Sequence, residues 1–187
     1  VGRASIWISE WRLTFTLTTG LDTSTGGAGN DSFAATAATV AGATVQTLNA
    51  GDNLNGGEGS DTLTLSNTSA TSAFGAGITT SSIENLSVNA VTTTSVDATL
   101  MSGLTGITNN GSLAALTVSG LTTIPAVSVI ASSANTTVTM GAATTVGIAD
   151  EMTVNLNGAS TTSGSTITAS GIEKFNVNAT GTASGSA

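Results

Sequence analysis

Residues 26–34 read GGAGNDSFA, and residues 56–64 read GGEGSDTLT. Both stretches match the nine-residue pattern G-G-x-G-x-D-x-U-x at every fixed position, where U is a large apolar residue. The glycines permit a tight turn with φ > 0 that directs carbonyl oxygens inward, the aspartate adds a carboxylate, and U enters the strand that follows. The two stretches therefore predict turns between short strands that are stacked on one another.

The oxygens of such turns are typical ligands of calcium. Ca²⁺ takes about six to eight oxygen ligands, so we expect two loops from neighbouring turns to share an ion. Partial copies of the motif end at Asp22 and Asp52, nine residues before the aspartates of the full copies. Two nonapeptides make one turn of a regular β-roll, so residues about 18 apart lie on the same edge. Asp31 and Asp52 are 21 residues apart, and we therefore expect them to share one ion. The residues that we assign to calcium are Gly26, Gly27, Ala28, Gly29, Asp31, Gly56, Gly57, Glu58, Gly59, Asp61, Asp22 and Asp52.

Beyond the loops, the chain alternates polar and apolar residues, as in residues 63–65 and 153–156. This period of two predicts half-buried strands. Residues 81–90 (SSIENLSVNA) reappear as residues 170–179 (SGIEKFNVNA), and a diluted copy lies at residues 113–118. Strands that recur in this way indicate solenoid repeats. We predict an all-β, parallel β-solenoid of the β-roll or β-helix type, with calcium-binding turns in its N-terminal third; a sandwich of hairpins is the alternative.

The predicted organisation has three parts. Residues 1–13 form an atypical N-terminal segment or linker, residues 14–66 a calcium-binding β-roll, and residues 67–187 a continuation of the solenoid rich in Ser, Thr and Ala. Within the last part, residues 70–76 and 97–104 are candidates for helix.

Charge is scarce in the chain. It has 187 residues with 3 Lys and Arg against 11 Asp and Glu, a net charge of −8, and no Cys. Nucleic-acid affinity depends on Lys and Arg that neutralise phosphates, so we expect no nucleic-acid partner. No run of eighteen apolar residues exists, and we expect no membrane insertion. The lack of Cys excludes disulfides and thiolate metal sites.

Catalytic chemistry has few candidates. Without His, Cys or Tyr, the chain has no Ser-His or Cys-His nucleophile and no His-ligated zinc, and we expect no enzyme; a hydrolase that uses only carboxylates is the alternative. The carboxylates of Asp150 and Glu151 would face opposite sides of a strand and so not share a substrate; in a turn they could bind a further cation. Glu84 and Glu173 occupy equivalent places in the repeated Ile-Glu motif, and we expect solvated side chains, with ligand or subunit contacts as the alternative.

Residues 14–66 resemble the repeats-in-toxin (RTX) calcium-binding nonapeptides. Together with the Ile-Glu-x-Leu/Phe-x-Val strands, they are similar to bacterial surface-layer proteins and large adhesins. The resemblance implies type I secretion, folding on external calcium, and an extracellular location on the bacterial cell surface. RTX proteins often carry long uninterrupted arrays, whereas residues 35–46 interrupt the array here.

The resulting hypothesis is a structural component of a cell-surface layer that is folded and assembled by calcium. Its partners would be copies of itself in a lattice or filament, and a cell-surface polysaccharide is a further candidate. Alternatives are an adhesin stalk, a calcium-folded export module of an RTX exoenzyme, and an ice- or glycan-binding solenoid. Thr-x-Thr pieces at residues 16–18, 62–64 and 137–139 would suit ice, but they do not recur at a fixed period.

Overall fold

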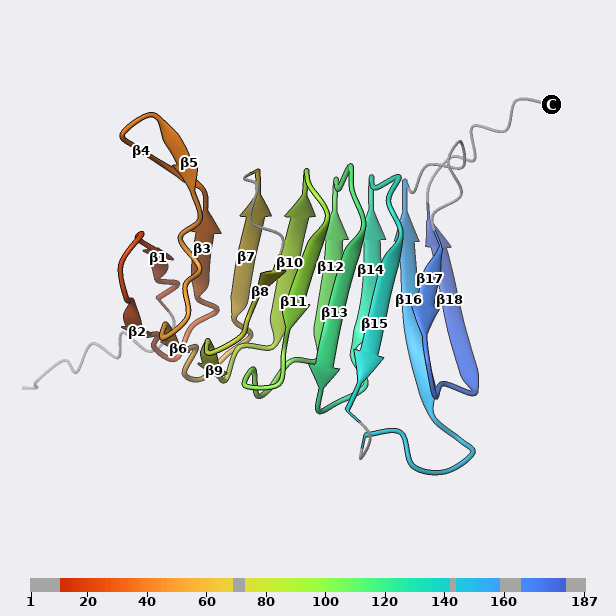
Figure 1. The fold of residues 1–187 in the computed structure, drawn as a ribbon. Helices are drawn as coiled ribbons and strands as arrows, with labels where there is room; N and C mark the ends of the chain where they lie inside the picture. The colour runs from red at the N-terminus through yellow and green to blue at the C-terminus, as the bar shows by residue number, and fades with distance from the viewer. Residues whose placement is uncertain (1–10, 69–72, 142–143, 159–165, 181–187) are drawn as a thin grey trace, which may run out of the picture.

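The computed structural model describes residues 11–68, 73–141, 144–158 and 166–180. Over these ranges the chain forms strands and turns without a helix, and its sheets are built from stacked parallel strands (Figure 1). The predicted all-β, parallel β-solenoid is therefore confirmed, and the sandwich of hairpins is wrong. A helix at residues 97–104 is also wrong, because β11 (Thr94–Asp97) ends there and turns follow. Of residues 70–76, Ala73–Phe74 form β8, and residues 70–72 lie outside the described residues.

The largest sheet has eight strands and runs along the whole stack (Figure 1). Each strand pairs in parallel with the equivalent strand of the next turn, so every turn hydrogen-bonds to its neighbours through the backbone. In sheet order, its strands are β1 (Thr14–Thr16), β3 (Ser32–Thr36), β7 (Thr62–Asn67), β10 (Asn85–Ala90), β12 (Gly106–Asn110), β14 (Ala126–Ile130), β16 (Glu151–Asn157) and β18 (Lys174–Thr180).

Two smaller parallel sheets complete the turns. A five-stranded sheet lies against the C-terminal part of the large sheet, and a three-stranded sheet belongs to the N-terminal turns (Figure 1). The five-stranded sheet contains, in order, β17 (Ile167–Ala169), β15 (Thr136–Met140), β13 (Leu116–Leu121), β11 and β8. The three-stranded sheet contains β2 (Thr23–Thr25), β6 (Asn53–Asn55) and β9 (Thr79–Ser81).

The core consists of columns of aliphatic side chains that face inward from successive strands. Alternation with a period of two places every second residue of a strand inside, as the pattern of burial in β7 and β10 shows. Phe15 stacks on Phe33 with ring centroids 4.8 Å apart at one end of the main column. In register, that column is Phe15, Phe33, Leu63, Leu86, Ile107, Val127, Val154 and Val177.

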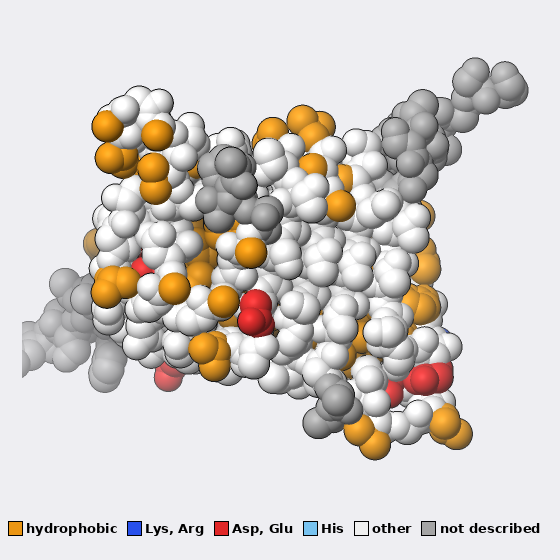
Figure 2. All heavy atoms as spheres, viewed as in Figure 1, with side chains coloured by type: hydrophobic (Ala, Val, Ile, Leu, Met, Phe, Trp, Pro, Cys, Tyr) orange, Lys and Arg blue, Asp and Glu red, His pale blue; other side chains and the backbone are white. Residues whose placement is uncertain are grey.

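The outer surface carries few charges. In the view of Figure 2, most exposed side chains are neither charged nor apolar, and acidic side chains occur at a few separate places. The outward residues of β7 are Thr62, Thr64 and Ser66, and those of β10 are Asn85, Ser87 and Asn89, all partly buried. Small polar side chains therefore cover these strands, as the composition predicts.

The number of residues in a turn varies along the stack. Residues one turn apart are 18 apart at Leu13 and Asp31, 30 apart at Asp31 and Asp61, and 23 apart at Asp61 and Glu84. The backbone pairing stays in register in spite of these differences. Successive turns therefore keep the same strand register, although they contain different numbers of residues.

The longest of these turns contains a hairpin that projects from the stack (Figure 1). It consists of β4 (Ala38–Val40) and β5 (Ala43–Val45), the antiparallel pair among the described strands. The two residues that join β4 to β5 are Ala41 and Gly42, with φ of 49° and 83°. The usual sequence signal for such a hairpin connection is an Asn-Gly pair. Val40 and Val45 are exposed, and Figure 2 shows hydrophobic side chains over the hairpin.

Candidate metal centre

The two full glycine motifs lie directly on one another. One loop connects β2 to β3, and the other connects β6 to β7. The backbone N–H of Gly26 donates to the Asn55 carbonyl at 2.8 Å, and that of Glu58 donates to the Gly27 carbonyl at 2.8 Å. The Ser60 N–H also donates to Oδ1 of Asn30 at 2.9 Å. The sequence motif thus produces two stacked loops in the same register.

Asp31 connects three turns of the solenoid. Its carboxylate accepts the backbone N–H of Leu13 from the preceding turn and that of Gly27 from its own loop, each at 2.6 Å. Its own N–H donates to Oδ1 of Asp61 in the following turn at 2.6 Å. Asp31 is buried, so these bonds replace its hydration.

Asp61 differs from Asp31 in one important respect. It is fully buried, and its Oδ2 has no hydrogen-bond partner, although Oδ1 accepts the Asp31 N–H. Burial raises the pKa of Asp61 above its ordinary value, the Asp31 N–H acts in the opposite direction, and the negative charges of Glu84 and Asp31 raise it further. A buried carboxylate oxygen without a partner is costly unless a proton or a cation neutralises it.

The first glycine of each loop makes room for these carboxylates. A Cβ placed on Gly26 would overlap Oδ2 of Asp31 and the Gly56 carbonyl oxygen. A Cβ on Gly56 would in the same way overlap Oδ2 of Asp61 and the Ser82 carbonyl oxygen. Each glycine thus leaves free the space of a Cβ, and a carboxylate oxygen of its own loop and a carbonyl oxygen of the next turn lie at that space.

The partial motifs form a second pair on another edge. Asp22 and Asp52 precede β2 and β6, and the Asp22 N–H donates to Oδ1 of Asp52 at 2.9 Å. The expected pairing of Asp31 with Asp52 is therefore wrong: Asp31 contacts Asp61, and Asp22 contacts Asp52. The physical reason is the hairpin, which lengthens this turn to 30 residues, so that residues 21 apart no longer share an edge.

The other residues assigned to calcium lie on the same two loops. Gly29 and Gly59 stack closely, since a Cβ on Gly59 would contact the Gly29 carbonyl oxygen. Gly57 has φ of 98° and lies against the Gly27 carbonyl. The side chains of Ala28 and Glu58 are exposed, and Glu58 takes part in loop stacking through its backbone N–H.

Sequence reasoning missed the role of the two repeated glutamates. Oε2 of Glu84 accepts the backbone N–H of Asp61 at 2.8 Å, and Oε2 of Glu173 accepts that of Asp150 at 2.9 Å. Both carboxylates thus bond to the turn that precedes them. Glu173 is exposed to solvent as expected, whereas Glu84 is partly buried by this contact. The signal was present in the repeated Ile-Glu motif, but sequence alone did not show what the glutamate contacts.

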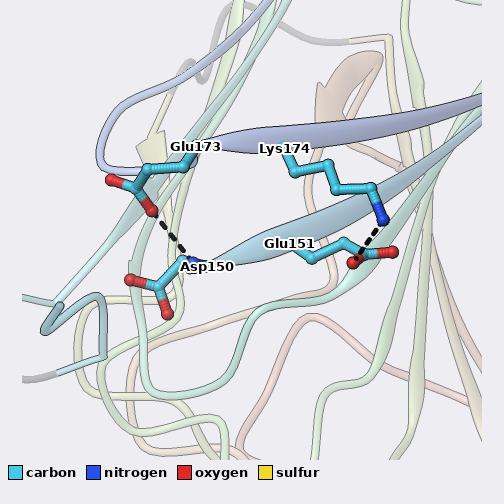
Figure 3. A network of polar contacts seen from close by, with 4 residues as sticks. All are labelled: Asp150, Glu151, Glu173 and Lys174. Carbon is cyan, nitrogen blue, oxygen red and sulfur yellow. Dashed lines mark hydrogen bonds and ion pairs between the residues drawn. The ribbon is translucent and has the colours of Figure 1, made fainter. Parts of the chain in front are cut away.

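Asp150 and Glu151 diverge as predicted for neighbours at the start of a strand. Figure 3 shows Glu151 directed toward Lys174, with which it forms an ion pair at 2.9 Å. Asp150 lies with Glu173 on the other side, and its Oδ2 is buried without a hydrogen-bond partner. The two carboxylates therefore do not form a catalytic pair.

The residues present fit a calcium-type cation at the stacked loops. The orphaned Asp61 Oδ2 is a hard oxygen donor, and carbonyl oxygens of glycine-rich turns are further donors of the same kind. Over the described ranges, no three acidic side chains converge on one point. An ion at the stacked loops would therefore be held by Asp61, backbone carbonyls and water, with Asp31 close by, and it would supply the positive charge that the buried carboxylates lack.

The Thr-x-Thr pieces do not form one array. Thr62 and Thr64 lie on β7 of the eight-stranded sheet, whereas Thr137 and Thr139 lie on β15 of the five-stranded sheet. Thr16 is separated from Thr64 in its column by Ala34. The flat lattice of threonines that ice binding requires is therefore not assembled from these pieces.

Comparison with known proteins finds no matching family model, no matching curated protein and no matching solved structure. Among the residues that the structure describes, no helix has the length and apolar character needed to cross a membrane.

Proposed function

We propose that this chain is an extracellular structural protein of a bacterial cell-surface layer, and that calcium folds it and allows it to assemble. The observation that carries the proposal is the stacking of the two glycine loops in register, with the buried Asp61 Oδ2 beside Gly56 and the Ser82 carbonyl lacking a partner. The buried Asp61 carboxylate carries a negative charge with no partner at Oδ2, and a bound cation supplies that partner.

Calcium acts in this proposal as a folding ligand. Asp31 and Asp61 are buried with a direct contact between them, so their negative charges oppose folding of the first turns. A cation that binds the folded loops and not the unfolded chain stabilises the fold by mass action. Folding would then depend on calcium outside the cell, as the resemblance to RTX repeats implies.

The rest of the chain suits a structural role. Its stacked turns are held by aliphatic columns and continuous backbone pairing, and its composition includes no His, Cys or Tyr that could supply nucleophilic chemistry. Solenoids of this type have edges that pair readily with further strands, so copies of the chain are the partner that we propose.

Removal of calcium tests the proposal. We expect a chelator such as EGTA to lower β-sheet content in circular dichroism and to dissociate any assembly that forms with calcium, and excess calcium to restore both. Asp31→Asn removes the charge and keeps one of the two acceptor oxygens, while its amide nitrogen faces the other N–H donor, so we expect it to bind less calcium and to fold less completely than the native protein. Circular dichroism and particle size that do not change on chelation would overturn the proposal.

A further inference from the structure

Asp61 and Glu84 form a compact acidic unit at the start of two adjacent strands. The Asp61 N–H donates to Oε2 of Glu84 at 2.8 Å, and the Asp61 carbonyl accepts the N–H of Asn85 at 3.0 Å. The Glu84 carboxylate therefore bonds to the backbone of Asp61, and its negative charge acts on the Asp61 carboxylate. Oδ2 of Asp61 is buried in this unit without a partner.

The same unit occurs again near the C-terminal end of the stack. The Asp150 N–H donates to Oε2 of Glu173 at 2.9 Å, and the Asp150 carbonyl accepts the N–H groups of Glu173 and Lys174 at 3.0 and 3.1 Å. Oδ2 of Asp150 is again buried without a partner. In both copies the glutamate follows the aspartate by 23 residues. We call each copy an Asp–Glu step.

A common turn positions the glutamate of each step. Ser82 and Gly171, two residues before the glutamates, both have left-handed backbones, with φ of 50° and 78°. The isoleucine between them packs inward, fully buried at Ile83 and against the core at Ile172. After the left-handed residue, the Ile-Glu pair leads the chain into the next strand, β10 or β18. The glutamate carboxylate then lies at the backbone N–H of the aspartate in the preceding turn.

Among the residues that the structure describes, no basic side chain is bonded to either step. Lys174 lies next to Glu173 in sequence, but its Nζ bonds to Glu151 at 2.9 Å on the other side (Figure 3). The whole chain has 3 Lys and Arg against 11 Asp and Glu, so most carboxylates must take counter-ions from solution. In each step a buried aspartate oxygen belongs to a residue that a second carboxylate contacts, and such an oxygen favours a bound cation over a diffuse one.

We propose that each Asp–Glu step binds one divalent cation of the calcium type: Glu84 is a further ligand of the ion at Asp61, and Asp150 and Glu173 bind a second ion. Carboxylate oxygens, with the Ser82 carbonyl beside Asp61, are the hard ligands that Ca²⁺ prefers. The inference goes beyond the stacked loops, because Glu84, Asp150 and Glu173 lie outside the glycine motif. It also places a cation at β16 and β18, far along the stack from that motif.

The number of calcium ions bound per chain tests the proposal. The full chain is equilibrated by dialysis against saturating calcium, and bound calcium is counted for the native protein, Glu84→Gln, Glu173→Gln and the double variant. Glutamine keeps an oxygen that can accept the aspartate N–H, so the turn can stay closed while the charge is lost. We expect each single variant to lose one ion and the double variant to lose two.

Two controls separate this proposal from the proposed function. Glu151→Gln removes the same charge one residue from Asp150 but outside the step, and we expect it to bind as many ions as the native protein. Asp31→Asn tests the stacked loops, and the ion at Asp150 and Glu173 should remain in that variant. Circular dichroism checks that every variant is folded under the conditions of the count.

The outcomes are distinct. If Asp31→Asn loses calcium while Glu84→Gln and Glu173→Gln bind as much as the native protein, the Asp–Glu steps are not cation sites and the proposed function stands. If only the glutamine variants lose ions, the steps are cation sites and the stacked loops are not. A native protein that binds no calcium overturns both.

Discussion

The side-chain amide of Asn109 donates a 2.7 Å hydrogen bond to the hydroxyl of Thr136 across the interior of the solenoid. Asn67 makes the same bond to Thr94 at 2.9 Å, and all four residues are fully buried. Each bond joins the eight-stranded sheet to the five-stranded sheet, in the middle of an otherwise apolar core. The two sheets are thus held by amide–hydroxyl pairs as well as by aliphatic packing.

Loss of one partner of such a pair should destabilise the fold. We expect Asn109→Leu to lower the free energy of unfolding by about 1–3 kcal/mol, because the Thr136 hydroxyl is left buried without its bond. Urea unfolding, followed by circular dichroism in the presence of calcium, measures this difference. Adding Thr136→Val to the first substitution should recover most of the loss, since both polar groups are then absent. A double variant as unstable as Asn109→Leu would contradict this account.

Close stacking of the loops makes Gly57 sensitive to substitution. It has φ of 98°, and a Cβ at this position would overlap the Gly27 carbonyl oxygen. We expect Gly57→Ala to lower the free energy of unfolding by about 1–3 kcal/mol through backbone strain alone. The overlap with the Gly27 carbonyl should also separate the two loops and so weaken calcium binding. Gly20→Ala is the matched control, because its nearest neighbour would lie 3.6 Å away. Thermal unfolding with and without calcium compares the two variants.

The raised pKa of Asp61 predicts a specific dependence on pH in the absence of calcium. Because burial raises the pKa of Asp61 in the folded state, that state holds the proton more tightly than the unfolded chain. The stability that protonated Asp61 contributes to the fold is therefore fully present below the pKa of an unfolded aspartate, about 3.9. It is lost as the pH rises through the higher pKa of Asp61 in the folded protein.

Asp61→Asn removes this dependence, because asparagine carries no charge and still offers Oδ1 to the Asp31 N–H. We expect the variant to be more stable than the native protein at pH 7 without calcium, and the difference to shrink toward pH 4. Excess calcium should reverse the order at pH 7. Urea unfolding of calcium-free samples across this pH range measures the difference, and equal stabilities at pH 7 would be inconsistent with it.

The ion pair of Lys174 with Glu151 should contribute little to stability. Both side chains are largely exposed, at 64% and 45%. We expect Lys174→Ala to change the free energy of unfolding by less than about 1 kcal/mol, since exposed pairs gain little net energy. Unfolding at low and high salt is the measurement, and a large loss that disappears in salt would contradict the prediction.

Sequence patterns predicted the strands and the class of fold because both depend on local periodicity. Alternation placed Leu63 and Leu65 inside β7, and the repeated Ile-Glu segments became β10 and β18 of the same sheet. The glycine motifs predicted that loops of neighbouring turns would lie together, but the pairing expected from their spacing, Asp31 with Asp52, was wrong. These features require only that neighbouring residues face opposite sides and that glycine allows close approach of the backbone.

Contacts between turns could not be predicted in the same way. The pairing of Asp31 with Asp61 depends on the hairpin, whose Ala41-Gly42 turn carries no strong sequence signal. The contact of Glu84 with Asp61 depends on a register between strands of different turns, which no local pattern reports. The same holds for Asn109, a polar residue at an inward position whose partner is 27 residues away.

The hairpin of β4 and β5 has a practical consequence. Thr47 Oγ1 donates to the Thr36 carbonyl at 2.6 Å, so the chain leaves the stack and returns to it at nearly the same point. The stack on either side of this excursion keeps its register. Residues 38–45 are therefore a natural grafting position, where a foreign peptide can replace the hairpin tip and be displayed on a rigid carrier. A chain with such a graft would present the peptide once, at a fixed position beside β3 and β7.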